Sequence, residues 1–171
     1  MNINIFFLII IAGLIMILFL FEPIKMKNQQ FDEIPLLKLE KFKINELNTQ
    51  GLSSILEGSI GLKYEDRYLI DTINYTDNEN KYLANIKSNS GLYKGNLLEL
   101  NGDVVYSRAD GFSFKSQKVE YNEKTKIVKS PTNYVSFKGK HKVVGSSIVY
   151  NSITEITKSK NVIINYKLKE R

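Results

Sequence analysis

Apolar residues recur at every second position in short runs along the chain beyond residue 36, and no stretch there has the period of about 3.6 residues expected of a helix. Such alternation is typical of β-strands with one face turned to a core. The pattern therefore predicts an all-β fold of antiparallel strands, arranged as a sandwich, a jellyroll or an open barrel. Turn-forming segments separate the runs: "TDNEN" (76–80), "SNSG" (88–91), "NG" (101–102), "ADG" (109–111), "NEKT" (122–125) and "SPTN" (130–133).

Two segments near the C-terminus repeat each other 29 residues apart, "KVEYNEKTKIVKSPTNYVSF" (118–137) and "SIVYNSITEITKSKNVIINY" (147–166). Apolar positions are kept in kind, and five polar or aromatic residues recur: Tyr121, Asn122, Thr125, Lys129 and Ser130 as Tyr150, Asn151, Thr154, Lys158 and Ser159. A fixed period indicates one supersecondary unit that is stacked repeatedly. We expect each copy to be a hairpin whose second strand begins just past the Lys-Ser step.

The N-terminal segment Ile5 to Phe21 is an uninterrupted run of seventeen apolar residues. As a helix it is about 26 Å long, close to the thickness of a bilayer core. A cleaved signal peptide fits less well, because the start "MNINI" has no basic side chain and no small-residue cleavage site follows Phe21. We therefore predict a transmembrane anchor over residues 1–24, a tether over 25–36 and a β-domain over 37–171.

The residue inventory argues against catalysis. The chain contains no Cys, which excludes cysteine metal sites and disulfides. Its single histidine, His141, has no carboxylate within ten residues and is predicted to be a satisfied surface side chain. The acid pair Glu65–Asp66 lies among turn residues. We expect no catalytic residue, no metal, no cofactor and no enzymatic activity.

Charge is divided unevenly along the chain. Residues 22–111 carry a net charge of −3, whereas residues 112–171 carry +9. Because these lysines alternate with apolar residues, the solvated face of a sheet accounts for them. An acidic partner surface or lipid phosphates are the alternatives, and no nucleic-acid partner is expected.

The order and spacing of several segments resemble the LptC family, the bitopic inner-membrane component of the lipopolysaccharide export machine. The resemblance covers nearly the whole chain. It is carried by the anchor and by "FKINELNTQGL" (42–52), "YLIDTINY" (68–75), "YLANIKSNSGL" (82–92), "LELNGDVVY" (98–106), "GFSFKSQKVEYN" (111–122), "VKSPTNYVSFKG" (128–139) and "GSSIVYN" (145–151).

The resemblance implies a periplasmic β-jellyroll, related to the bridge protein LptA, behind a single-pass inner-membrane anchor. It places the C-terminal domain in the periplasm, although Lys25 and Lys27 after the anchor conflict with the positive-inside rule. The implied partners are lipopolysaccharide, the inner-membrane Lpt ABC transporter complex, reached through the anchor and the N-terminal part of the jellyroll, and an LptA-like bridge.

The function implied is a relay that receives lipopolysaccharide from the transporter and passes it to the bridge. Splayed sheets would shelter acyl chains in a groove, since each methylene removed from water contributes about 0.8 kcal/mol. Alternation predicts the residues that line this groove: Leu69, Ile73, Tyr75, Ala84, Ile86, Leu100, Val104, Phe114, Tyr121, Val135, Phe137 and Ile148. The alternative is a membrane-tethered β-sandwich scaffold of an envelope complex that binds protein only.

The last repeat copy has no strand after it, so "NVIINYKL" (161–168) is a candidate free edge of the sheet. Such an edge invites a strand from a partner. We expect a partner-docking edge at Gly139, Val162, Ile164 and Tyr166, with the N-terminal edge of LptA as the implied partner. The alternative is an edge covered by the C-terminal tail or by residues 36–44.

Overall fold

The computed structural model describes residues 34–49, 51–79 and 82–166, which form twelve strands paired antiparallel in one sheet. This confirms the expected all-β antiparallel class. The strands are β1 (Leu37–Asn48), β2 (Gly51–Lys63), β3 (Arg67–Asp77), β4 (Ala84–Lys94), β5 (Leu97–Arg108), β6 (Phe112–Asn122), β7 (Ile127–Ser130), β8 (Tyr134–Lys138), β9 (His141–Gly145), β10 (Ser147–Asn151), β11 (Ile156–Lys160) and β12 (Ile163–Asn165). Within these ranges there is no helix long and apolar enough to cross a membrane. The predicted anchor, Ile5 to Phe21, lies outside the described residues.

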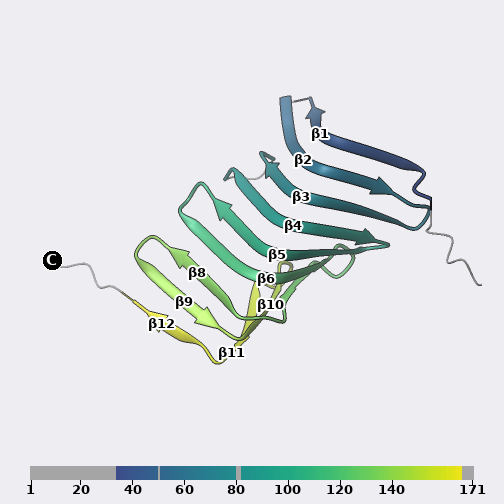
Figure 1. Cartoon of the computed structure of the whole chain (residues 1–171). Coiled ribbons are helices and arrows are strands. Elements are labelled where there is room, and N and C mark those ends of the chain that lie inside the picture. Colours follow the sequence, from purple (N-terminus) through teal and green to yellow (C-terminus); the bar gives the residue numbers. More distant parts are fainter. Residues whose placement is uncertain (1–33, 50, 80–81, 167–171) are drawn as a thin grey trace, which may run out of the picture. The chain divides into compact units, whose positions relative to one another are not determined.

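The six long strands β1 to β6 are curved and lie side by side (Figure 1). Their pairing is interrupted along one line, which we call the corner: Lys41, Ser59, Thr72, Asn89, Asp103 and Gln117. Every second strand has a non-glycine residue of positive φ there, namely Lys41, Thr72 and Asp103. One left-handed residue bends a strand and changes which face its side chains take. The sheet therefore folds along this line.

Beyond β6 the bent strands are replaced by pairs of separate short strands, one on each side of the corner. The first half of β6 pairs with β8 and its second half pairs with β7. One branch then continues from β8 through β9 to β12, and the other continues from β7 through β10 to β11 (Figure 1). The successive strands β11 and β12, separated only by Asn161 and Val162, thus form the last bent unit of the sheet.

The sequence repeat corresponds to a structural repeat. Asn122 accepts a hydrogen bond from the Thr125 backbone N–H at 2.9 Å, and Asn151 accepts the equivalent bond from Thr154 at 3.1 Å. The expected hairpin boundary is wrong, however. The second strands, β7 and β11, begin before the Lys-Ser step, and that step lies at their C-terminal ends. Each copy is therefore a hairpin followed by a corner and a third strand.

Some of the expected turns are also wrong. "ADG" and "NEKT" lie at turns, but "SNSG" lies within β4 and "NG" within β5. There Gly102 and Asp103 have φ of 75° and 46° and shift the register toward β6. A left-handed Gly-Asp step fits a bulge at the corner as well as it fits a hairpin turn, so the local sequence is ambiguous.

Candidate functional site

The apolar side chains of the sheet gather on one side, which we call the inner face. Its centre is a buried cluster of Ile73, Leu100 and Val104, which are between 2% and 7% exposed. Half-buried side chains pack around this cluster, and they come from both sides of the corner: Leu56, Ile70, Tyr75, Ile86, Leu98 and Val119. Among the described residues, the only other buried apolar side chains are Ala84 and Tyr134, which lie outside this cluster. A core this small leaves much of the inner face only partly covered by protein.

The corner places residues three apart on the same face. Ile73 belongs to the inner cluster and Ile70 packs against it. Ile70 and Phe42 also lie close together beside Gly58, because a Cβ added there would be 2.9 Å from Ile70 and 2.7 Å from Phe42. Strict alternation would have separated Ile70 from Ile73. Because Thr72 lies between them with a φ of 56°, the strand exchanges its faces at that point.

Three of the predicted groove residues lie on the outer face. Leu69 pairs with Leu62 and Leu92, and these three line a hollow of about 320 Å³ on the side opposite Ile70. Val135 and Phe137 pair with Lys115 and Ser113, so they lie opposite Phe114.

Tyr134 explains the choice of face in β8. Its ring stacks on Phe114 at 5.5 Å between centroids, and it is 5% exposed. A Cβ at Gly145 would meet the same ring at 2.6 Å, so the space for Tyr134 exists because residue 145 is glycine. The pair Tyr134 and Ser136 therefore faces inward, and the apolar pair Val135 and Phe137 faces outward.

The remaining predicted groove residues share the inner face. Cross-strand pairing connects Tyr75, Ile86, Tyr106 and Phe114 in one row. Ala84 lies in the same strand as Ile86, two residues away, and Leu98, Tyr121, Val128 and Tyr150 form a row on the other side of the corner. Ile148, two residues before Tyr150, belongs to the second group. Leu56, Ile70, Leu98 and Val119 also face inward but were not among the predicted residues. Alternation itself indicates Leu98 and Val119, which lie two residues before Leu100 and Tyr121, whereas Ile70 is indicated only by the left-handed Thr72.

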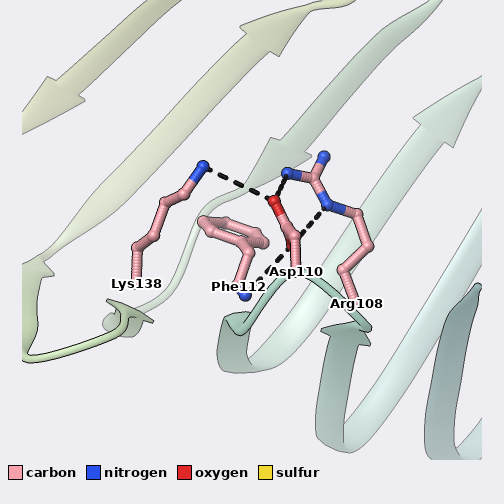
Figure 2. Close-up of polar contacts among 4 residues, drawn as sticks. All are labelled: Arg108, Asp110, Phe112 and Lys138. Atoms are coloured by element: carbon pink, nitrogen blue, oxygen red, sulfur yellow. Dashed lines mark hydrogen bonds and ion pairs between the residues drawn. The ribbon is translucent and has the colours of Figure 1, made fainter. Parts of the chain in front are cut away.

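A charged cluster closes the β5–β6 turn at one margin of the inner face (Figure 2). The Arg108 guanidinium donates two hydrogen bonds to the Asp110 carboxylate, at 3.0 and 2.6 Å, and Lys138 lies 3.5 Å from it. The Phe112 backbone N–H donates a further bond of 3.2 Å. These contacts, that from Arg108 above all, hold the pKa of Asp110 well below its usual range.

The predicted docking strand pairs on one side only. β12 pairs with β9 through Ile163–Val144, Ile164–Val143 and Asn165–Lys142, and no described strand pairs with its other side. Val162, Ile164 and Tyr166 are between 42% and 67% exposed. Gly139 lies in the β8–β9 turn rather than on this edge, so its inclusion was wrong. The docking role of the others stays a prediction.

His141 is not the satisfied surface histidine that the sequence suggested. It is half-buried and stacks on Tyr166 with ring centroids 4.2 Å apart, and its Nδ1 is buried without a hydrogen-bond partner. The contact fixes the end of β12 against β9. Within the described ranges no group of His, Asp and Glu side chains is arranged to hold a metal ion.

The fold and the inner face define an all-β protein built as one bent antiparallel sheet. Residues 6–164 match the family model for lipopolysaccharide assembly, LptC-related. The chain therefore belongs to the LptC family, a non-enzymatic component of lipopolysaccharide transport.

Among solved structures, the chain is similar to LptH, described as the LptA homologous periplasmic component of the conserved lipopolysaccharide transport device from Pseudomonas aeruginosa. The two are 10% identical with a TM-score of 0.44, over 77% of this chain and 94% of that one. No curated protein matches the chain.

Proposed function

We propose that this protein is a membrane-anchored relay, which takes lipopolysaccharide acyl chains onto its inner face and passes them to a periplasmic β-jellyroll bridge. Residues 1–24 anchor it in the inner membrane, residues 25–36 are the tether, and residues 37–171 lie in the periplasm. The Lpt ABC transporter complex supplies lipid through the anchor and the N-terminal part of the sheet. Membership of the LptC family supports this assignment.

One observation carries the lipid-binding step. The inner face presents half-buried Leu, Ile, Val and Tyr side chains around a cluster of only three buried residues. A sheet that only needed a core would cover such side chains more fully, because each exposed methylene forfeits about 0.8 kcal/mol. Acyl chains can cover this face without any directional polar contact. The protein therefore needs no catalytic group to hold them.

Photocrosslinking in cells tests the proposal at single positions of β3. A photoreactive residue at Ile70 or Ile73 should capture lipopolysaccharide, because both side chains lie on the inner face. The matched controls are Leu69 and Asn74; Leu69 lines the outer hollow and Asn74 hydrogen-bonds Glu57 at 2.7 Å. Capture at all four positions would contradict an inner lipid-binding face. Capture at none, with no lipid in mass spectra of the gently purified protein, would favour a scaffold that binds protein only.

The transfer step rests on the free edge. The sheet ends in one bent unit, β11 and β12, and neither strand pairs with a further described strand. If a partner's strand continues this edge, its apolar face continues the inner face of this sheet. Lipid can then move from one protein to the next without crossing water.

A further inference from the structure

One margin of the inner face carries a row of tyrosines that the relay proposal leaves without a role. Four hairpin turns lie along this margin: 64–66, 95–96, 123–126 and 152–155. The arrowheads of β2 and β4 point toward it in Figure 1. Each of the four hairpins places one tyrosine two residues from its turn: Tyr68, Tyr93, Tyr121 and Tyr150.

Strand pairing aligns these tyrosines into a single row. Tyr68 pairs with Tyr93, which pairs with Leu98, and Leu98 pairs with Tyr121. Val128 connects Tyr121 to Tyr150. The row belongs to the inner face, because Leu98 packs on the buried cluster. We call these four side chains the tyrosine rim.

The tyrosine rim combines apolar ring surface with polar groups at the boundary with water. The Tyr68 and Tyr93 ring centroids are 6.3 Å apart, Tyr68 is 44% exposed, and Tyr93 donates a hydrogen bond of 2.8 Å to Glu123. Lys63 lies over the Tyr68 ring, 5.6 Å from its centroid. The exposed residues Lys124 and Lys126 stand in the β6–β7 turn on the same side. Tyr side chains are favoured where one end of a group is apolar and the other is wet.

Each margin carries a carboxylate that two cations engage. Beside the tyrosine rim Asp66 contacts Arg67 and Lys94, and at the opposite margin Asp110 contacts Arg108 and Lys138 (Figure 2). A sugar ring offers a C–H face that packs on an aromatic ring, together with hydroxyls that exchange hydrogen bonds with a phenol. Its phosphate substituents suit nearby lysines. The tyrosine rim offers both kinds of group, in the rings of Tyr121 and Tyr150 and in the exposed Lys124 and Lys126 of the β6–β7 turn.

We propose that the tyrosine rim binds the phosphorylated saccharide headgroup of the glycolipid whose acyl chains occupy the inner face. This inference rests on the proposed function and adds an orientation to it. The acyl chains lie over Ile73 and Leu100, and the headgroup leaves the face between the hairpin turns that carry Tyr121 and Tyr150. The rim thereby distinguishes a glycolipid from other amphiphiles with similar chains.

Binding of two probes to the full chain in lipid nanodiscs tests the rim. The probes are rough lipopolysaccharide and a 14-carbon fatty acid, and the test variant is Tyr93→Leu combined with Tyr150→Leu, two rim positions outside the predicted groove lining. It should bind lipopolysaccharide about tenfold more weakly and the fatty acid unchanged, because only the headgroup loses aromatic contacts. The matched control Tyr64→Leu, a tyrosine on the same side whose ring contacts Arg67, should bind both probes as the wild type does.

If the variant loses affinity for both probes equally, the tyrosines only line or support the acyl site. If it binds both probes as tightly as the wild type does, the rim has no part in recognising the headgroup. Either result overturns the inference. If the wild type binds neither probe, the relay proposal itself fails. A photoreactive residue at Tyr150 provides an independent measurement, because a crosslink reports which part of the lipid lies nearby and does not depend on a loss of binding. It should crosslink to the saccharide, whereas one at Ile73 should crosslink to an acyl chain, as mass spectrometry of the adducts resolves. Acyl adducts at Tyr150 would overturn the orientation.

Discussion

The Tyr134 hydroxyl donates a hydrogen bond of 2.8 Å to the Ser159 hydroxyl and so joins β8 to β11, which belong to different branches of the sheet. The direction follows from Ser159, whose single proton is donated to the Ser147 carbonyl at 2.7 Å. Tyr134 is 5% exposed, so this bond lies at the inside of the fold where the branches diverge. It connects the middle of the sheet to its last bent unit, which includes the predicted docking strand.

The contribution of this bond to stability should appear as a coupling between the changes in the free energy of unfolding that substitutions of its two partners cause. We expect Tyr134→Phe to lower the free energy of unfolding by about 0.5–1.5 kcal/mol, because the Ser159 oxygen loses its donor. Ser159→Ala and the double variant complete a double-mutant cycle, read by urea denaturation. The double variant should cost less than the sum of the single variants. Strict additivity would show that the two hydroxyls do not interact in solution.

Gly145→Ala tests the space required by the same tyrosine. An added Cβ would lie 2.6 Å from Cε1 of Tyr134, whose ring cannot move away without losing its stack on Phe114. We expect the variant to lose about 1–3 kcal/mol of stability, as overpacked cores do. Combined with Tyr134→Leu, the same alanine should cost much less, because the ring is gone. An unchanged cost in that background would mean that the strain arises elsewhere.

The Asp110 cluster should make stability depend on pH only in acid. Because the pKa of Asp110 is lower in the folded chain than its ordinary value of 3.8, its contribution is fully present above that value and is lost as pH falls toward the folded pKa. Asp110→Asn should therefore unfold at lower temperature than the wild type at pH 7, and the difference should shrink below about pH 4.

Two neighbouring substitutions separate the contributors to this cluster. Arg108→Met should reproduce the effect of Asp110→Asn, since Arg108 makes the two shortest contacts with the carboxylate. Lys138→Met should have little effect, since Lys138 is 3.5 Å away and 64% exposed. A difference between Asp110→Asn and the wild type that persists unchanged to pH 2 would contradict an ionised carboxylate as its source.

Ile164→Pro should abolish docking of an LptA-like bridge, because proline removes a backbone donor from the free edge and interrupts strand addition. The matched control is Ile44→Pro in β1, the strand at the other end of the sheet. It should leave pull-down of the bridge at the wild-type level. We expect deletion of residues 161–171 to abolish docking as well. Deletion is harder to interpret than substitution, because the loss of β12 exposes β9 as a new edge. If Ile164→Pro still binds the bridge and Ile44→Pro does not, the docking edge is β1.

The class of the fold and the repeated turn follow from the amino-acid sequence alone. Alternation of apolar and polar residues is a local property of each strand, and it identified antiparallel β-structure without any tertiary information. The repeat likewise located equivalent turns, since Asn122 and Asn151 bond to backbone N–H groups only three residues away. Alternation did not identify β2, because Gly58 and Gly61 interrupt its apolar positions. Both are glycine where the Phe42 ring packs over the strand.

The side of the sheet that each apolar side chain takes is set instead by tertiary contacts. Lys41 and Thr72 adopt a left-handed backbone that their own residue types do not favour, and the neighbouring strands impose it where the sheet folds. Leu69 and Ile73 are four residues apart and would share a face in a regular strand, yet Thr72 between them puts Leu69 outside. In β8, the space left by Gly145 sets Tyr134 inward and turns Val135 outward. Such choices depend on partners distant in sequence, so no local pattern contains them.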